Sequence, residues 1–212
     1  MPSAPVNLLD YDDSRLTAFF ASAGEEPARA RMRSKQVLRW LHQDLVDDFA
    51  SMSNLAKTAR AHLQQIAAVG MPAVMRDTTA ADGTRKWLLD VGNGNAVETV
   101  FIPEDDRGTL CVSTQAGCAM GCKFCLTARQ GFKRNLTPGE IVGQVIALRH
   151  ETPDGPHINN IVMMGMGEPL ANYENTVRSI QILTSDFGGG MSNRRITVST
   201  CGLAPQIVQL GK

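Results

Sequence analysis

Four of the five cysteines of the chain lie close together, in the stretch CVSTQAGCAMGCKFC. Cys118, Cys122 and Cys125 form the group Cys-x-x-x-Cys-x-x-Cys, and Cys111 lies seven residues upstream. A structural zinc site usually takes four ligands from two Cys-x-x-Cys pairs, and this stretch has only one such pair. A redox-active Cys-x-x-Cys would leave Cys118 without a role. Three thiolates favour a [4Fe–4S] cluster with one iron open to a substrate, and a zinc site of all four cysteines stays open as the alternative.

The composition is that of an ordinary globular protein. Hydrophobic residues make up 43% and charged residues 20% of the 212 residues, and the formal net charge is zero. A neutral chain has no global field toward nucleic acid or membrane, so such attraction must come from local patches. The sequence shows no signal-peptide pattern and no apolar run long enough to span a bilayer. We therefore expect a cytoplasmic protein with reduced thiols and no membrane partner.

The first seventy residues have the pattern of amphipathic helices. Apolar residues recur at helical spacing over 25–46 and over 53–70, and five basic side chains lie between residues 29 and 39. A basic stretch of this kind can hold RNA phosphates, although a solvated helix face is the plain alternative. The pattern predicts a helical, RNA-binding accessory domain over 1–75. A β-hairpin connection with the turn GNGN is predicted over 76–108.

From residue 109 onward, strand patterns and helix patterns alternate. Strands are expected at 109–113, 158–165 and 195–200, with helices over 137–150 and 172–183. Alternation of this kind is typical of a parallel sheet with crossover helices. Thr137 and Glu140 match a capping box, and Pro138 suits the first helical position. We predict an α/β fold in which residues 109–212 form the first β/α units of an incomplete barrel, and we expect the chain to be the N-terminal part of a longer protein.

The cysteine stretch also carries a specific family resemblance. CAMGCKFC resembles the Cys-x-x-x-Cys-x-aromatic-Cys signature of the radical S-adenosylmethionine (SAM) enzymes. The wider stretch from VETVFIPEDDRG through the cysteines, together with VMMGMGEPLANYENT and RRITVSTCGLAP, resembles the RlmN-type, dual-specificity 23S rRNA and tRNA adenine carbon-2 methyltransferases. The likeness covers essentially the whole chain and is weakest over its first seventy residues. It implies a helical N-terminal accessory domain followed by the first part of a radical SAM partial (β/α)6 barrel, truncated.

The resemblance implies two cofactors, a [4Fe–4S] cluster and SAM. It assigns the cluster to Cys118, Cys122 and Cys125. It assigns SAM contacts to Gly167 and Glu168 of MGMGEP and to Ser199 at the end of the next strand. Without the resemblance, a strand-to-helix turn would explain the glycine, and a satisfied strand-end hydroxyl would explain the serine.

The resemblance also implies two catalytic residues, Glu98 as a proton acceptor and Cys111. In the family, a downstream cysteine receives a methyl group from SAM, and the counterpart of Cys111 releases the RNA by forming a disulfide with that carrier. We expect the carrier beyond Lys212 and interpret Cys201 as a small buried residue, so this chain alone is expected to be inactive. Without the resemblance, Cys111 would be explained as a buried cysteine of a strand, and Glu98 as a glutamate on the solvent face of a strand.

The function implied is methylation of carbon 2 of adenine in 23S rRNA and tRNA through a methyl-cysteine intermediate. The implied partners are these RNAs and an electron donor such as a flavodoxin system, and we expect a monomer. Two alternatives stay open. One is the sister branch that methylates carbon 8 of adenine, and the other is a four-cysteine zinc RNA-binding module.

Overall fold

The N-terminal part of the chain is a small helical unit. The structure is a computed structural model that describes residues 5–105, 107–151 and 158–211. The unit contains β1 (Val6–Asn7), η1 (Leu8–Asp10), α1 (Asp13–Ser22), α2 (Pro27–His42), η2 (Phe49–Ser51), α3 (Lys57–Ile66) and β2 (Ala67–Ala68). β1 pairs with β2 in parallel and brings the two ends of the unit together. The helices predicted over 25–46 and 53–70 are confirmed, with shorter bounds.

The rest of the chain is built on a six-stranded mixed sheet, with the strand order β10-β9-β6-β5-β4-β3. Its strands are β3 (Ala73–Thr79), β4 (Arg85–Asp90), β5 (Ala96–Glu104), β6 (Arg107–Cys111), β9 (Ile158–Met163) and β10 (Ile196–Val198). β3 to β6 pair antiparallel, whereas β6, β9 and β10 pair in parallel, as their alternation with helices predicted. The GNGN turn joins β4 to β5, where Gly92, Asn93 and Gly94 have φ of 80°, 54° and 70°.

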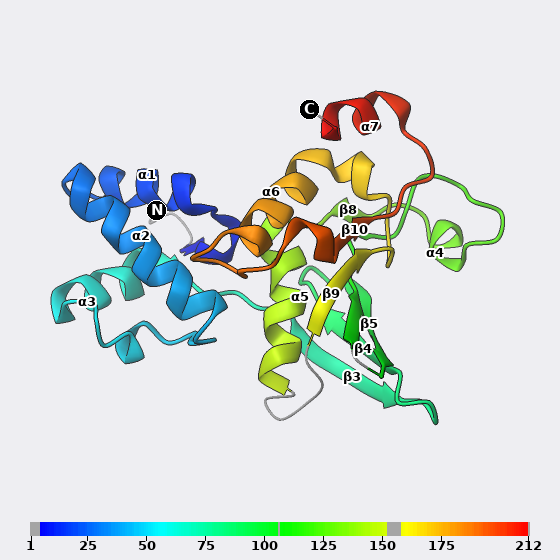
Figure 1. Cartoon of the computed structure of the whole chain (residues 1–212), viewed down its shortest axis with the longest axis horizontal. Coiled ribbons are helices and arrows are strands. Elements are labelled where there is room, and N and C mark those ends of the chain that lie inside the picture. Colours follow the sequence, from blue (N-terminus) through cyan, green and yellow to red (C-terminus); the bar gives the residue numbers. More distant parts are fainter. Residues whose placement is uncertain (1–4, 106, 152–157, 212) are drawn as a thin grey trace.

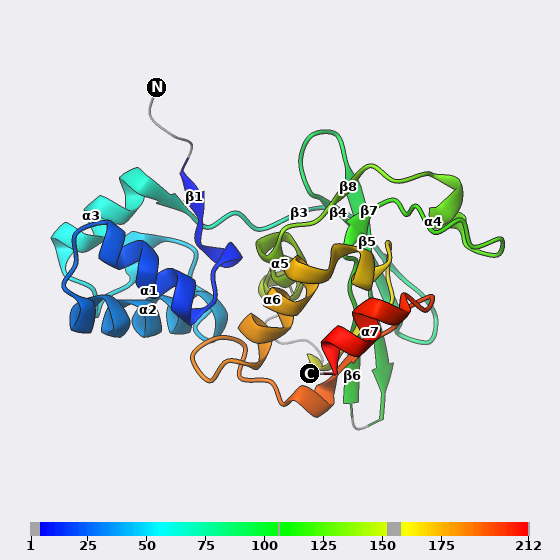
Figure 2. The same ribbon diagram turned by 90° about the horizontal axis from the view of Figure 1, so that it is seen from above.

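Two helices, α5 (Pro138–Glu151) and α6 (Tyr173–Thr184), cover one face of this sheet. They lie between the sheet and the N-terminal helices (Figures 1 and 2). The capping box predicted at the start of α5 is present. The N–H of Thr137 donates to Glu140 Oε2 at 2.9 Å, and the N–H of Glu140 donates to Thr137 Oγ1 at 3.2 Å. Helical spacing predicts an apolar stripe of Ile141, Val145 and Leu148 on α5, and all three side chains are buried.

Helical spacing of apolar residues predicts that α6 buries Val177, Ile180 and Leu183, and the structure agrees only in part. Leu183 is buried as expected, but Val177 and Ile180 are only half-buried, and Thr176 and Ser179 are fully buried instead. These hydroxyls can face the interior because each donates to a backbone carbonyl, Thr176 to Pro169 at 2.8 Å and Ser179 to Asn175 at 2.7 Å.

The other face of the sheet is open in the part of the chain that the structure describes. Val100 of β5 lies beside Cys111 of β6, Cys111 lies beside Val162 of β9, and Val162 lies beside Thr197 of β10. Registered partners share a face, so these side chains lie opposite the α5 side, as does Glu98 two residues before Val100. β3, β4 and β5 belong to the same sheet as β6, β9 and β10. The division into 1–75, 76–108 and 109–212 stays a prediction.

Across the described residues, no helix combines the length and the apolar character that a membrane span requires.

Candidate functional site

Three loops meet at the carboxyl ends of the parallel strands β6, β9 and β10. They are residues 112–116, 164–168 and 199–201. The N–H of Thr114 donates to the carbonyl of Met166 at 2.9 Å, which ties the first loop to the second. The carboxyl edge of parallel strands is where α/β proteins bind ligands.

Two glycines of the second loop pack directly against the first loop. Gly167 has φ of +99°, and a Cβ at this position would lie 2.5 Å from Cβ of Gln115. A Cβ on Gly165 would lie 2.7 Å from Oγ of Ser113. The close backbone approach that these glycines permit is to the neighbouring loop. Glycine is required because any side chain would separate the two loops.

Glu168 joins the second loop to the third. It is buried, its Oε1 accepts from the N–H of Leu170 at 2.9 Å, and its Oε2 accepts from the N–H of Cys201 at 2.7 Å. Burial by itself raises the pKa of the Glu168 carboxyl. Hydrogen bonds from these two N–H groups and from the side chains of Thr200 and Cys201 outweigh burial, so the pKa lies below its ordinary value. Glu168 is therefore ionised at neutral pH.

Cys201 was predicted to be a small buried residue, and this prediction is wrong. The residue is exposed, at the rim of the site. The hydrogen bond to the Glu168 carboxylate is the main reason that the pKa of Cys201 is raised to about 11, followed by burial and by the charges of Glu168 and Cys122. The exposure of Cys201 follows from the path of the third loop, which local sequence does not encode.

The cysteine loop, residues 117–133, leaves and re-enters the fold at one narrow point. β7 (Gln115–Ala116) pairs antiparallel with β8 (Arg134–Asn135), and α4 (Leu126–Arg129) lies between them. Gly117 has φ of +75° and packs so closely on the carbonyl of Gly131 that no Cβ fits. The loop is therefore clamped at its base, while its tip extends from the body of the molecule (Figure 1).

The three predicted cluster ligands all lie on this loop. Cys118 is buried at its base, and Cys122 and Cys125 are half-buried further out. Hydrogen bonds from the backbone N–H of Ala128, and more weakly from Thr127, lower the pKa of Cys125 despite the opposing effect of burial. No three His, Cys, Asp or Glu side chains converge into a metal-binding group within the described ranges. The donor set is three free thiols on one loop, one of them biased toward thiolate, and it fits a thiolate-held metal centre.

The two predicted catalytic residues lie on neighbouring strands of the open face. Burial raises the pKa of Cys111 at the end of β6, although the N–H of Met164 partly offsets this. Glu98 of β5 is exposed, and its Oε1 lies 2.9 Å from Nζ of Lys86. All five cysteines are described and free, so the disulfide implied for Cys111 has no counterpart within this chain.

A buried polar residue that the sequence analysis missed anchors the site. Gln144 of α5 is fully buried, and its Oε1 accepts from Oγ1 of Thr99 at 2.7 Å and from the N–H of Ser113 at 2.8 Å. Its Nε2 donates to the carbonyl of Ser113 at 2.8 Å. Ser113 Oγ in turn donates to the carbonyl of Glu98 at 2.6 Å and accepts from the N–H of Met166 at 2.9 Å. A glutamine inside the apolar run IVGQVIAL was the available signal.

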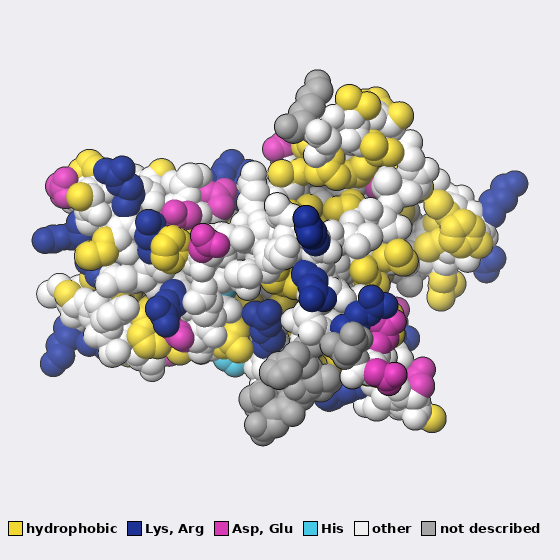
Figure 3. Space-filling view, in the orientation of Figure 1, with side chains coloured by type: hydrophobic (Ala, Val, Ile, Leu, Met, Phe, Trp, Pro, Cys, Tyr) yellow, Lys and Arg dark blue, Asp and Glu magenta, His cyan; other side chains and the backbone are white. Residues whose placement is uncertain are grey.

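The surface around the cysteine loop is rich in apolar side chains. Phe124 is 94% exposed and Leu126 is 70% exposed. Figure 3 shows hydrophobic side chains gathered at the end of the molecule where α4 lies.

The basic side chains predicted between residues 29 and 39 do not all lie on one exposed face of α2. Arg33 is buried and ion-paired with Glu25, so it does not belong to a solvated basic face.

Comparison with known proteins identifies both parts of the chain. Residues 6–69 match the ribosomal RNA large subunit methyltransferase N-terminal domain, and residues 112–210 match the radical SAM superfamily. The structure is similar to that of a radical SAM methyltransferase from Sphaerobacter thermophilus, with 41% sequence identity and a TM-score of 0.88. The match covers 98% of this chain and 60% of that one.

The superfamily's cofactors are a [4Fe–4S] cluster and SAM, which agrees with the three-thiol loop beside a glycine-rich loop. The helical N-terminal domain and the partial α/β domain follow one another in the order that the matched families predict. The chain therefore belongs to the RlmN-type radical SAM methyltransferases.

Proposed function

We propose that the protein methylates carbon 2 of adenine in 23S rRNA and in tRNA through a methyl-cysteine intermediate. The observation that carries this proposal is the packing of residues 112–116, which lead into the cysteine loop, against the loop of residues 164–168 at the carboxyl ends of β6 and β9. The packing would set a SAM-binding loop beside a cluster-binding loop, as radical SAM chemistry requires.

Six residues would hold the cofactors. Cys118, Cys122 and Cys125 would bind the cluster, and Gly167, Glu168 and Ser199 would bind SAM. When bound, the cluster supplies the electron that cleaves SAM. Glu168 is ionised, and besides one backbone N–H at each oxygen it accepts from the side chains of Thr200 and Cys201. The SAM ammonium group would take the place of those side-chain donors and leave the two backbone bonds intact.

Glu98 and Cys111 would act on the RNA. In our proposal, the adenine enters the open face of the sheet, and the Glu98 carboxylate accepts the proton that leaves carbon 2. The raised pKa of Cys111 keeps its Sγ protonated at neutral pH until the step in which it resolves the link to RNA. The target base must leave its stack to reach this face. An electron donor such as a flavodoxin system, a monomeric state and a cytoplasmic location complete the proposal.

Anaerobic reconstitution with iron and sulfide, followed by SAM titration under electron paramagnetic resonance, tests the cofactor site. We expect a reduced [4Fe–4S] signal that shifts when SAM is added. Bound zinc without a cluster would contradict the proposal and support the four-cysteine module. The proposed reaction also needs the methyl-carrying cysteine that we expect beyond Lys212. Mass spectrometry of 23S rRNA and tRNA transcripts after incubation with SAM and a reduced protein that includes this cysteine would then locate the methyl group on adenine.

A further inference from the structure

A hollow with two basic side chains lies on the open face of the sheet. Its volume is about 190 Å³, and it is formed by β3, β4 and β5. Five side chains line it, those of Arg76, Thr78, Lys86, Leu88 and Glu98. The strand register explains this grouping, because Arg76 pairs with Leu88 and Leu88 pairs with Glu98. The hollow therefore lies on the same face of the sheet as the two proposed catalytic residues.

A second row of paired residues connects the hollow to Cys111. Lys86 pairs with Val100 on β5, and Val100 pairs with Cys111 on β6. Neighbouring strands lie about 4.8 Å apart, so the backbone of Lys86 lies two strand spacings, about 10 Å, from that of Cys111. One nucleotide spans a distance of this size. A nucleotide whose base lies at Cys111 is therefore long enough to place a flanking phosphate over the hollow.

The charges in the hollow favour an anionic ligand. Nζ of Lys86 lies 2.9 Å from Oε1 of Glu98, and about half of each side chain is exposed. An ammonium group has three N–H donors, so two remain for a ligand. Arg76 is exposed and, among the residues that the structure describes, forms no ion pair. Two cations thus face one carboxylate, and one positive charge in the hollow has no counter-charge.

We propose that Arg76 and Lys86 bind a backbone phosphate of the RNA substrate, next to the adenine that is methylated. Ammonium and guanidinium groups both donate to phosphate oxygens, and a guanidinium can do so through two parallel N–H groups. Contacts to phosphate fix the position of a nucleic acid on a protein. The hollow thus holds the nucleotide while its base lies beside Glu98 and Cys111. The inference rests on the proposed function and adds to it a binding site for the backbone of the substrate.

Fluorescence anisotropy with the full chain, reconstituted with iron and sulfide and supplied with SAM, tests the inference. Two labelled RNA heptamers each carry one central adenosine among uridines and two neutral methylphosphonate linkages. In the first probe the neutral linkages flank the adenosine, and in the second they lie at the two ends. Both probes have the same net charge, so their non-specific attraction is equal. We expect the second probe to bind about fivefold more tightly, which is the effect of one half-exposed ionic contact.

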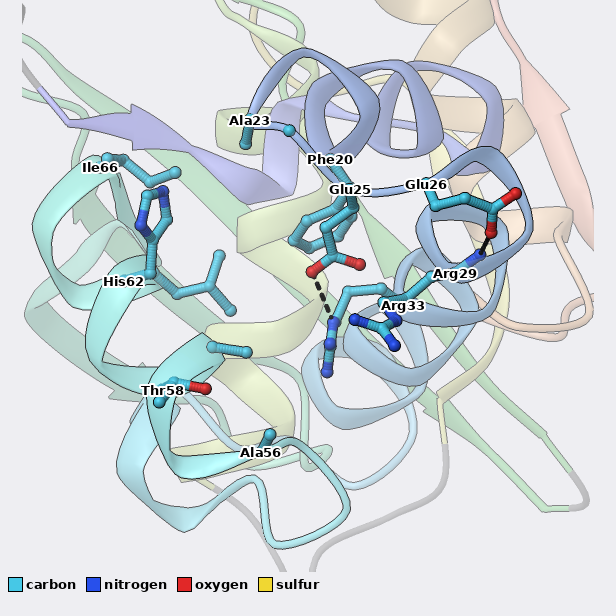
Figure 4. Close-up of a pocket in the computed structure, with 13 residues that line it drawn as sticks. Phe20, Ala23, Glu25, Glu26, Arg29, Arg33, Ala56, Thr58, His62 and Ile66 are labelled. Carbon is cyan, nitrogen blue, oxygen red and sulfur yellow. Dashed lines mark hydrogen bonds and ion pairs between the residues drawn. The ribbon is translucent and has the colours of Figure 1, made fainter.

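Lys86→Gln and Arg76→Gln should each reduce this preference, because each removes one of the two cations. Arg29→Gln is the matched control. Arg29 is also an exposed arginine, but it lies on α2, beside the separate cavity of the N-terminal domain (Figure 4). Its replacement should leave the preference unchanged. Glu98→Gln should increase the preference, because it removes the charge that repels the phosphate.

The possible outcomes separate this site from the proposed function. Equal binding of the two probes by the wild-type chain would overturn the phosphate site alone. If Lys86 served only to hold the Glu98 carboxylate, Lys86→Gln and Glu98→Gln would change the preference alike, and this would also overturn the site. If thermal melting shows that Lys86→Gln unfolds the chain, Arg76→Gln decides the matter. Absence of any RNA binding would overturn the site and count against the proposed RNA substrate, whereas a SAM-responsive cluster signal would be unaffected.

Discussion

The carboxylate of Glu168 accepts a hydrogen bond from the backbone N–H of Cys201 at 2.7 Å, across 33 positions of sequence. This contact joins the loop after β9 to the loop after β10 and fixes both at the edge where the cysteine loop begins. It also sets the protonation of Cys201, because a negative charge beside a thiol disfavours the thiolate.

Glu168→Gln should therefore make Cys201 more reactive. The pKa of Cys201 is raised to about 11, chiefly by Glu168, so the wild-type thiol should alkylate slowly at mildly alkaline pH although it is exposed. Removing the charge lowers that pKa and increases the thiolate fraction. Peptide mass spectrometry after timed iodoacetamide treatment of the metal-free chain would measure the rate at each cysteine. Cys125 is the internal control, and an unchanged rate at Cys201 would contradict the assignment.

Replacing Cys111, Cys118, Cys122 and Cys125 one at a time should distinguish the three cluster ligands from Cys111. We expect Cys118→Ala, Cys122→Ala and Cys125→Ala each to reduce bound iron and sulfide sharply after anaerobic reconstitution. Cys111→Ala should leave both close to the wild-type amounts, because Cys111 lies on β6 and not on the loop. Metal analysis and the visible absorption spectrum measure this. Loss of metal in all four variants would support a four-thiolate site.

Gly167→Ala should destabilise the fold by about 2–5 kcal/mol. The strain of an alanine in a left-handed backbone conformation adds to the steric overlap of its Cβ with Gln115. The new Cβ would lie 2.5 Å from Cβ of Gln115, in a backbone conformation with φ of +99°. Gly94→Ala is a matched control, because Gly94 has φ of +70° but nothing within 4 Å of an added Cβ. That variant should lose only about 1–2 kcal/mol. Urea unfolding gives both values, and equal losses would show that contact with Gln115 is unimportant.

Gln144→Leu should cost about 2–4 kcal/mol, because it leaves buried polar groups without partners. The orphaned groups are the Thr99 hydroxyl and the backbone N–H and carbonyl of Ser113. Gln181→Leu provides a control on α6, where the glutamine is exposed, and should change the free energy of unfolding little. A Gln144 variant as stable as the control would mean that Ser113 finds other partners.

The sequence by itself determined the features that depend on neighbouring residues. The capping box of Thr137 and Glu140, the GNGN hairpin and the alternation of strands and helices were all predicted, because each depends on backbone preferences within a few positions. The placement of three cysteines on one loop after a strand follows in the same way. These local signals, with the family resemblance, were sufficient to indicate the kind of site.

Only the tertiary structure decided which distant groups meet. Cys201 is exposed beside Glu168, and Arg33 is buried against Glu25. Gln144 holds Ser113, in the segment that leads into the cysteine loop. None of these contacts follows from hydrophobic periodicity, because a buried polar residue is stable only when the fold supplies its partner. The partner comes from another helix or loop, so its position depends on how the elements pack.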